Sequence, residues 1–269
     1  SIFTNGAETT YWVSKINHIT DYFKTVDINI YHTKGKLQGP LGSVEPQNVI
    51  SILRATKNDI DLLLPISVLD SDIYINKINV STPRLFCDFP LIGTEDLKIP
   101  AIIQSSLFEV TEPRDGIWLT NPTRQDPKVD LNKKLFEEAI LLYTELLKYG
   151  ANSNWINLFN MAANEKPGVS DWLYEPWYID RILKPIRKAI LYTPIIVNES
   201  GEKKSIKNDE GKFNIYFPSN NNSQIRERIW ELCYPLFASQ IPKRSDIHEW
   251  FDVIWSDLVV LDLKQISTF

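Results

Sequence analysis

The sequence has few glycines, and they do not gather into the loops that bind phosphate groups. Ten of the 269 residues are glycine, which is below the usual share of about 7%. None of the patterns G-x-x-x-x-G-K-[ST], G-x-G-x-x-G and G-x-S-x-G occurs. The chain therefore carries no P-loop, no dinucleotide-binding fingerprint and no nucleophile elbow of a serine hydrolase.

Cysteine and histidine are also scarce, which limits disulfides and metal sites. The only cysteines, Cys87 and Cys233, lie far apart in apolar surroundings. We expect buried free thiols and a reducing, cytoplasmic location. The three histidines are His18, His32 and His248, and their spacing does not support a zinc site. His248-Glu249 begins like H-E-x-x-H, but Asp252 stands where the second histidine is required.

Two further absences exclude classes of partner. There is no secretory signal and no apolar run of about 18 residues, so we expect no membrane partner. The formal net charge is −5, which argues against binding nucleic acid by neutralising phosphates. The remaining composition is that of an ordinary globular chain, 43% hydrophobic and 23% charged.

The pattern of apolar residues predicts an α+β fold in two domains. Residues 1–120 are rich in short alternating or continuous apolar runs and predict a mostly antiparallel sheet of five to seven strands. Residues 121–269 predict a mainly helical domain with a small hairpin near 193–217. The candidate segments for these five to seven strands are Thr9–Ser14, Val26–His32, Val49–Ala55, Ile60–Ile66, Asp70–Val80, Leu85–Phe89, Ile99–Ser105 and Ile117–Thr120.

The helical half has recognisable start and stop signals. Asp130 is the expected N-cap of a helix that Gly150 ends, because its apolar residues recur every three or four positions. We expect further helices over Ser153–Ala163, after Ser170 with breaks at Pro176 and Pro185, from Ser223, and from Ser245. The hairpin is expected to pair Thr193–Asn198 with Lys212–Phe217.

The most unusual stretch runs from Arg84 to Thr120. It contains C-D-F-P-L-I-G-T-E-D-L-K-I-P followed by T-E-P-R-D-G-I-W-L. These residues resemble a segment that follows the ATPase domain in bacterial sacsin-like proteins, which are heat-shock-90-type (GHKL) ATPases. The later runs W-I-N-L-F-N-M-A and I-R-E-R-I-W-E-L are similar to the same family, but the resemblance is sharp only from Phe86 to Thr120.

The resemblance implies a chaperone-like ATPase whose nucleotide domain lies outside this sequence. The family's D-x-G-x-G is missing, and its G-x-x-G is matched only by Gly39-Pro-Leu-Gly42, which is typical of a turn. Together with a first residue that is serine, this predicts a fragment of a longer protein. The chain would be a non-catalytic transducer with its own N-terminal ATPase domain as partner. ATP and Mg²⁺ would bind only to the full-length protein.

Arg114 is the main candidate site residue, with Lys98 as a weaker one. The resemblance implies that a cation on the turn Thr111–Gly116 contacts the terminal phosphate in the neighbouring domain. The alternative is an ion pair from Arg114 to Glu112 or Asp115 that fastens the turn. A second alternative is a hydrolase that uses the loop carboxylates as general acid and base. The carboxylates concerned are Glu95, Asp96, Glu109, Glu112 and Asp115.

An aromatic group in the helical half suggests a different function. Trp172, Trp177 and Tyr178, with Tyr174 between them, could anchor a protein client or self-association. The chain would then be a free-standing interaction module. The alternative is that these rings fill gaps between packed helices.

Overall fold

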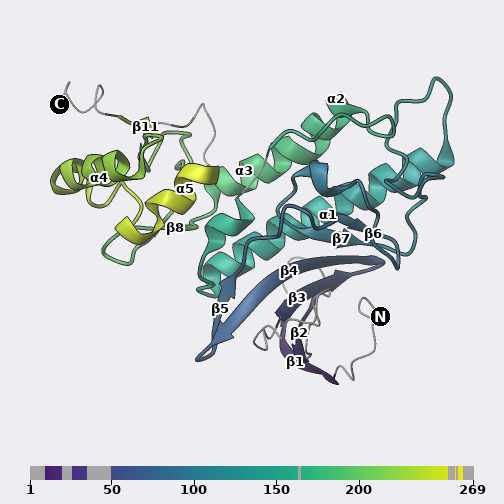
Figure 1. Cartoon of the computed structure of the whole chain (residues 1–269), viewed down its shortest axis with the longest axis horizontal. Helices are drawn as coiled ribbons and strands as arrows, with labels where there is room; N and C mark the ends of the chain where they lie inside the picture. The colour runs from purple at the N-terminus through teal and green to yellow at the C-terminus, as the bar shows by residue number, and fades with distance from the viewer. Residues whose placement is uncertain are drawn as a thin grey trace, which may run out of the picture.

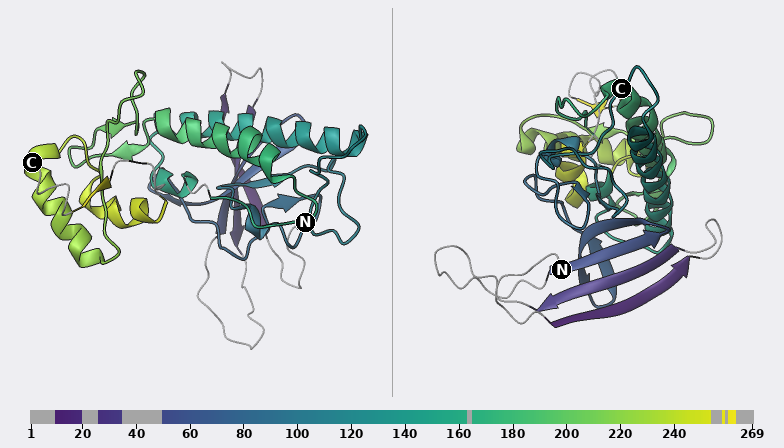
Figure 2. Two further views of the ribbon diagram at one scale, coloured as in Figure 1. Left: turned by 90° about the horizontal axis from the view of Figure 1, so that it is seen from above. Right: turned by 90° about the vertical axis from the view of Figure 1, so that its right-hand side faces the viewer.

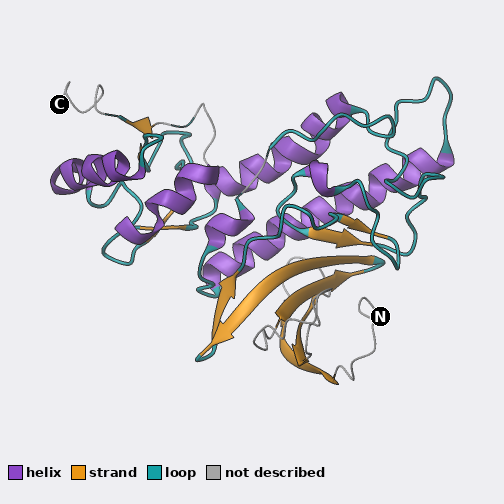
Figure 3. Cartoon of the chain, viewed as in Figure 1, coloured by secondary structure: helices purple, strands orange, loops and turns teal. Residues whose placement is uncertain are grey.

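The computed structural model describes residues 10–19, 26–34, 50–162, 165–253, 258 and 260–262. Its fold is α+β, as predicted from the sequence: a curved sheet formed largely by the N-terminal residues is followed by helices (Figures 1 and 3). The helices and loops lie on one side of the sheet (Figure 2). Within the described residues, no helix combines the length and apolar character needed to cross a membrane.

The sheet has seven strands in the order β1-β2-β3-β4-β7-β6, with β5 also paired to β4. All pairs are antiparallel except β6 with β7, so the predicted mostly antiparallel sheet is confirmed. The strands are β1 (Thr10–Ile19), β2 (Val26–Lys34), β3 (Ile50–Lys57), β4 (Ile60–Leu69), β5 (Asp72–Ile75), β6 (Leu85–Phe86) and β7 (Ile102–Gln104).

Strand β4 is the centre of this sheet. One edge pairs with β3, and the other is divided between β7 near Leu62 and β5 near Val68. Its residues Ile60–Leu64 are all buried, which explains a continuous apolar run instead of an alternating one. The last predicted strands are shorter than expected: Ile117–Thr120 forms only isolated bridges, to Val110 and Leu173.

Helix α1 (Pro127–Asn152) covers the sheet. Its N-cap is Asp126, whose side chain accepts a hydrogen bond from the Lys128 backbone, with Pro127 in the first turn. The prediction that Asp130 is the cap is therefore wrong, since a proline in the first turn already favours the earlier start. The predicted apolar face is buried as expected at Leu135, Ala139, Leu142 and Leu146.

Gly150 does not end α1, which continues for two residues to Asn152. The glycine lies where the helix meets the buried ring of Trp155. A Cβ built at Gly150 would be 2.5 Å from Cε3 of that ring. The position therefore requires glycine because another side chain comes close, and not because the backbone turns left-handed.

The helix predicted over Ser153–Ala163 is wrong in the residues that the structure describes. Only the 3₁₀ turn Leu158–Met161 forms there. Ile156, two residues before this turn, pairs with β5 instead. Ile75 N–H donates to Ile156 O at 2.9 Å, and Ile156 N–H donates to Ile73 O at 2.8 Å. Pairing with the open edge of β5 thus overrides the local helical preference.

The helix expected after Ser170 forms as three consecutive helical pieces around its two prolines. It consists of α2 (Glu175–Tyr178), a π-helical turn (Ile179–Leu183) and α3 (Lys184–Tyr192). Pro176 begins α2 instead of breaking it. Ahead of Pro185, Lys184 N–H donates to Ile179 O, five residues earlier. A widened turn of this kind is a known cause of helix kinks.

The C-terminal part forms small pairs of strands around two helices. β8 (Ile196–Val197) pairs with β9 (Lys203–Lys204), and β10 (Phe217–Pro218) pairs in parallel with β11 (Val260–Leu261). A hairpin is present, but the predicted pairing of Thr193–Asn198 with Lys212–Phe217 is wrong. α4 (Ser223–Phe237) begins at the predicted residue and is capped by Asn222, and α5 (Ile247–Val253) follows a 3₁₀ turn.

Buried apolar side chains form one large and one small cluster. The large cluster includes side chains from Val26 to Leu258, so it crosses the domain boundary predicted between residues 120 and 121. The division into two domains stays a prediction. The small cluster lies under α4 and consists of Ile229, Trp230, Cys233, Ile241, Ile247 and Leu261.

We expect Gly150→Ala to destabilise the protein. Alanine normally improves a helix by up to about 1 kcal/mol, but here the added methyl would overlap the Trp155 ring, and overpacking costs about 1–3 kcal/mol. Chemical denaturation of the variant and the wild type measures the difference. A more stable Gly150→Ala protein would show that the ring moves aside freely.

We expect Cys233 to resist alkylation in the folded protein. Burial raises the pKa of its thiol to about 11, so at pH 8 on the order of one molecule in a thousand carries the reactive thiolate. Iodoacetamide labelling followed by mass spectrometry checks this, with guanidinium-unfolded protein as the control. Fast labelling of Cys233 in the native protein would contradict the buried position.

Candidate functional site

The turn Thr111–Gly116 is closed by its own backbone and one side chain. Thr111 N–H donates to Gly116 O at 3.0 Å, and Arg114 N–H donates to Thr111 O at 2.9 Å. The Thr111 hydroxyl donates to the Asp115 carboxylate at 2.7 Å and accepts from the Asp115 N–H at 3.2 Å. Arg114 has a φ of 59°, an uncommon left-handed conformation for a residue with a side chain.

The side chain of Arg114 is exposed and has no carboxylate partner among the residues that the structure describes. Its guanidinium carbon lies 5.1 Å from the centre of the Phe89 ring, within the range of a cation–π contact. No ion pair joins it to Glu112 or Asp115 among the described residues, and Asp115 instead bonds Thr111. The alternative in which an ion pair of Arg114 fastens the turn is therefore wrong.

The residues that follow the turn hold it against the helical half. A Cβ at Gly116 would lie 2.2 Å from Cε2 of Trp172, so the indole packs directly on the glycine. Leu119 N–H donates to Trp172 O and Tyr174 N–H donates to Leu119 O, both at 2.9 Å. The turn thus leads directly into the segment that begins α2.

Asn132 on α1 fastens the same hairpin from the other side. The side chain is completely buried. Its Oδ1 accepts from Glu109 N–H at 2.9 Å, while its Nδ2 donates to Glu109 O at 2.8 Å and to Trp118 O at 3.1 Å. These bonds satisfy backbone groups that would otherwise be buried without partners.

A second polar turn, Gly93–Asp96, lies beside the first. A Cβ at Gly93 would be 3.1 Å from Asp115 O. The buried Thr94 hydroxyl accepts from the N–H groups of Arg84 and Leu85 at 3.0 and 3.1 Å. The predicted turns are therefore brought together into one surface, which we call the two-turn surface (residues 93–96 and 111–116).

A buried guanidinium organises the chain around this surface. Arg84 is 6% exposed, and Nε donates to Ile99 O at 3.2 Å while Nη1 donates to Asn79 O at 3.2 Å and also to Thr82 O. Burial lowers the pKa of Arg84, and the Glu95 carboxylate partly offsets this. A cation held by backbone carbonyls joins the turn at residues 79–82 to the loop at Ile99.

Lys98 and the loop carboxylates have separate local contacts. Lys98 is half exposed and has a φ of 55°. Its Nζ lies 3.9 Å from Asp96 Oδ1. Glu95 accepts from Gly93 N–H at 2.6 Å, and Glu109 lies 3.8 Å from Lys128 Nζ. In the part of the chain that the structure describes, none of these carboxylates contacts another, so the geometry adds no support for an acid–base pair.

The predicted aromatic anchors are mostly core residues. Trp172 is 6% exposed and Tyr178 is fully buried, with its hydroxyl donating to Leu97 O at 2.9 Å. The burial of both rings gives no support to the interaction role predicted for these two, which stays a prediction. Trp177 is half-buried, edge-on to Phe136, and its indole N–H donates to Glu137 at 3.2 Å.

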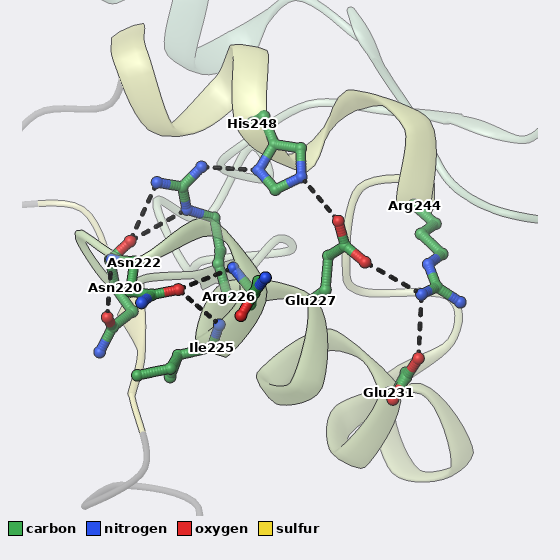
Figure 4. A network of polar contacts seen from close by, with 9 residues as sticks. Asn220, Asn222, Ile225, Arg226, Glu227, Glu231, Arg244 and His248 are labelled. Atoms are coloured by element: carbon green, nitrogen blue, oxygen red, sulfur yellow. Dashed lines mark hydrogen bonds and ion pairs between the residues drawn. The ribbon is translucent and has the colours of Figure 1, made fainter.

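His248 belongs to a polar network between α4 and α5 (Figure 4). Its Nδ1 lies 2.7 Å from Arg226 Nη1, which can only donate, so Nδ1 accepts. Nε2 then carries the hydrogen and donates to Glu227 at 3.2 Å. Both ring nitrogens are used, and no group of three or more metal-ligating side chains occurs among the described residues.

Comparison of the chain with protein-family models, with curated proteins and with solved structures gives no match. The candidate site therefore depends on the residues themselves and on the resemblance stated for residues 86–120. Sequence reasoning missed Asn132 and Arg84, since an asparagine inside a helix and an arginine in a loop are ordinary surface residues until the fold buries them.

We expect Asn132→Ala to loosen the hairpin that carries Arg114. Glu109 N–H and Trp118 O would lose their partner, and Glu109 O would keep only the Trp118 N–H at 3.3 Å, at a cost of about 2–3 kcal/mol in unfolding free energy. Chemical denaturation measures the loss, and hydrogen exchange of residues 109–118 locates it. Asn152→Ala, at an exposed position of the same helix, is the matched control; equal effects of the two changes would contradict the clamp.

Proposed function

We propose that this chain is the non-catalytic transducer segment of a heat-shock-90-like, sacsin-like ATPase. Its partner is the protein's own N-terminal ATPase domain, which would hold ATP and Mg²⁺, and the whole would act in the cytoplasm. The observation that carries the proposal is the exposed guanidinium of Arg114, which stands on a backbone-closed turn and has no carboxylate partner in the described part of the chain.

A guanidinium in this setting suits contact with a phosphate group. It offers several donors in a planar fork that matches phosphate oxygens. Because the turn is already closed, little conformational entropy remains to be lost when the contact forms. A cation placed in advance where charge develops stabilises the transition state of phosphoryl transfer. Lys98, on the neighbouring turn, is the weaker candidate for the same role.

The contacts behind the turn supply a route from this cation to the helices. The indole of Trp172 packs on Gly116, and Tyr178 bonds Leu97 at the end of the second turn. Tyr178 directly precedes the π-helical turn Ile179–Leu183. Short π-helical turns are frequent at functional sites, and in this proposal the turn acts as a hinge that passes a small displacement to α3.

The loss of two predicted anchors weakens the alternative of an interaction module that docks through its aromatic helical half. Trp172 and Tyr178 are committed to the core, and Trp177 is held by Phe136 and Glu137. A hydrolase using the loop carboxylates has no supporting contact. The transducer proposal therefore explains more of the observed surface than either alternative.

Substituting Arg114 in the protein that also contains the ATPase domain tests the proposal. We expect Arg114→Ala to reduce kcat for ATP hydrolysis by about a hundredfold or more, with little change in nucleotide affinity. Arg124→Ala, on an exposed linker nearby, is the control and should leave turnover unchanged. Steady-state kinetics and nucleotide titration separate the two quantities.

Two results would contradict the proposal. One is unchanged turnover of a folded Arg114→Ala protein. The other is ATP hydrolysis by the 269-residue chain alone. The coding sequence upstream offers an independent check, since a D-x-G-x-G motif within about one domain length is expected there.

A further inference from the structure

The aromatic ring of Phe89 lies under the exposed cation of the two-turn surface. The guanidinium carbon of Arg114 is 5.1 Å from the centre of this ring, and a phenylalanine face attracts a cation at distances up to about 6 Å. The two residues come from different loops, so the fold brings them together and not the local sequence.

Phe89 belongs to a loop that is closed by two nested hydrogen bonds. Leu91 N–H donates to Leu85 O at 3.0 Å, and inside this bond Cys87 N–H donates to Phe89 O at 2.9 Å. Asp88 has a φ of 58°, in the left-handed region. The Phe89 side chain is half-buried and packs against the large apolar cluster. The backbone and the core together therefore leave the ring little freedom to move.

Arg114 reaches this ring from a turn that is closed in the same way. Its own φ is 59°, and its N–H donates to Thr111 O at 2.9 Å. The two loops touch, since a Cβ at Gly93 would lie 3.1 Å from Asp115 O. Burial raises the pKa of the Cys87 thiol, and the charge of Arg114 is near enough to oppose that shift. The cation therefore lies close to the loop that carries the ring.

The ring contact leaves the hydrogen-bonding capacity of Arg114 intact. A guanidinium has five N–H donors, and within the described part of the chain none of them bonds a protein group. A carboxylate partner would also direct the side chain, but it would occupy donors and offset the charge. An aromatic face attracts the cation and does neither. Phe89 is thus suited to direct a cation that must still bind an anion.

Lys98, the weaker candidate for the same role, is held in a different way. Its Nζ lies 3.9 Å from Asp96 Oδ1, so a carboxylate partly offsets its charge. The contact with an aromatic ring therefore distinguishes Arg114 from Lys98.

We propose that Phe89 is a positioning residue, which holds the Arg114 guanidinium in the direction needed to contact the terminal phosphate of ATP. The inference rests on the proposed function for the phosphate contact, whereas the contact with the ring can be tested by itself. A restrained cation loses less conformational entropy on meeting the phosphate than a freely rotating arginine side chain does. Phe89 acts in this way only through Arg114.

Kinetics of the protein that also contains the ATPase domain test this role. Phe89→Leu keeps an apolar side chain against the core and removes the aromatic face. We expect kcat for ATP hydrolysis to fall about threefold, the effect of losing a cation–π contact at an exposed site, with unchanged nucleotide affinity. Phe89→Tyr retains the face and should keep the wild-type kcat. Circular dichroism and chemical denaturation check that both variants fold.

A double-mutant cycle separates positioning from a merely structural role. In protein that already carries Arg114→Ala, Phe89→Leu should cause no further loss of kcat, because the side chain that it positions is absent. A structural effect of the leucine would lower kcat by the same factor in both backgrounds.

NMR of the 269-residue chain tests the ring contact without any ATPase activity. An aromatic ring shields protons that lie over its face, so the Hδ and Nε–H signals of Arg114 should lie upfield of their positions in an unstructured peptide. Phe89→Leu should return these signals toward those positions. The side-chain signals of Arg124, on the exposed linker, are the control and should not change.

Three outcomes would overturn this inference and leave the proposed function standing. The first is a wild-type kcat for Phe89→Leu when Arg114→Ala lowers it. The second is an equal loss from Phe89→Leu with and without Arg114→Ala, or a loss from Phe89→Tyr as large as that from Phe89→Leu. The third is Arg114 signals in the wild-type chain that are not shielded. Unchanged turnover of Arg114→Ala would instead overturn the proposed function and the positioning role together.

Discussion

The side-chain amide of Asn132 is the contact on which the arrangement of this molecule most depends. It lies on α1, the helix that covers the sheet, and it bonds both strands of the hairpin that carries the Arg114 turn. The hairpin has almost no sheet ladder of its own, so its backbone groups need partners from elsewhere. A fully buried amide with all of these bonds made is strongly directional. The position of the turn is therefore set by the helix.

The same segment is fixed from two other directions by unusual means. Arg84 is buried and is held by carbonyl oxygens of the loops around it, and no described carboxylate lies within bonding distance. Trp172 packs on Gly116, where only a glycine leaves room for the indole. Loops that would be mobile on a typical surface are thus built into a rigid two-turn surface. The proposed contact of Arg114 with a phosphate depends on this rigidity.

The C-terminal end is held together by contacts of its own. Its own small buried cluster lies under α4, and the Arg226–His248–Glu227 network joins α4 to α5. The end presents apolar side chains outward while the two-turn surface presents charge. One chain therefore presents two surfaces of distinct chemistry on separate parts of the fold.

The sequence by itself determined the elements that are formed by contacts between residues close together in the chain. The antiparallel strands β2 to β4 and helix α1 were predictable, because alternation, apolar runs and a helical repeat are all short-range signals. The existence of two polar turns around residues 93–96 and 111–116 was predictable for the same reason. The exposed state of Arg114 was one of two alternatives that the sequence left open.

Only the tertiary structure decided the features that depend on residues distant in the chain. Ile156 joins β5 instead of a helix because an unpaired strand edge lies beside it. Gly150 is required by Trp155 and not by a helix end, and Trp172 and Tyr178 are core residues because the Arg84–Thr120 segment folds over them. Burial and close approach are properties of the assembled fold, and a residue's own neighbours in sequence do not encode them.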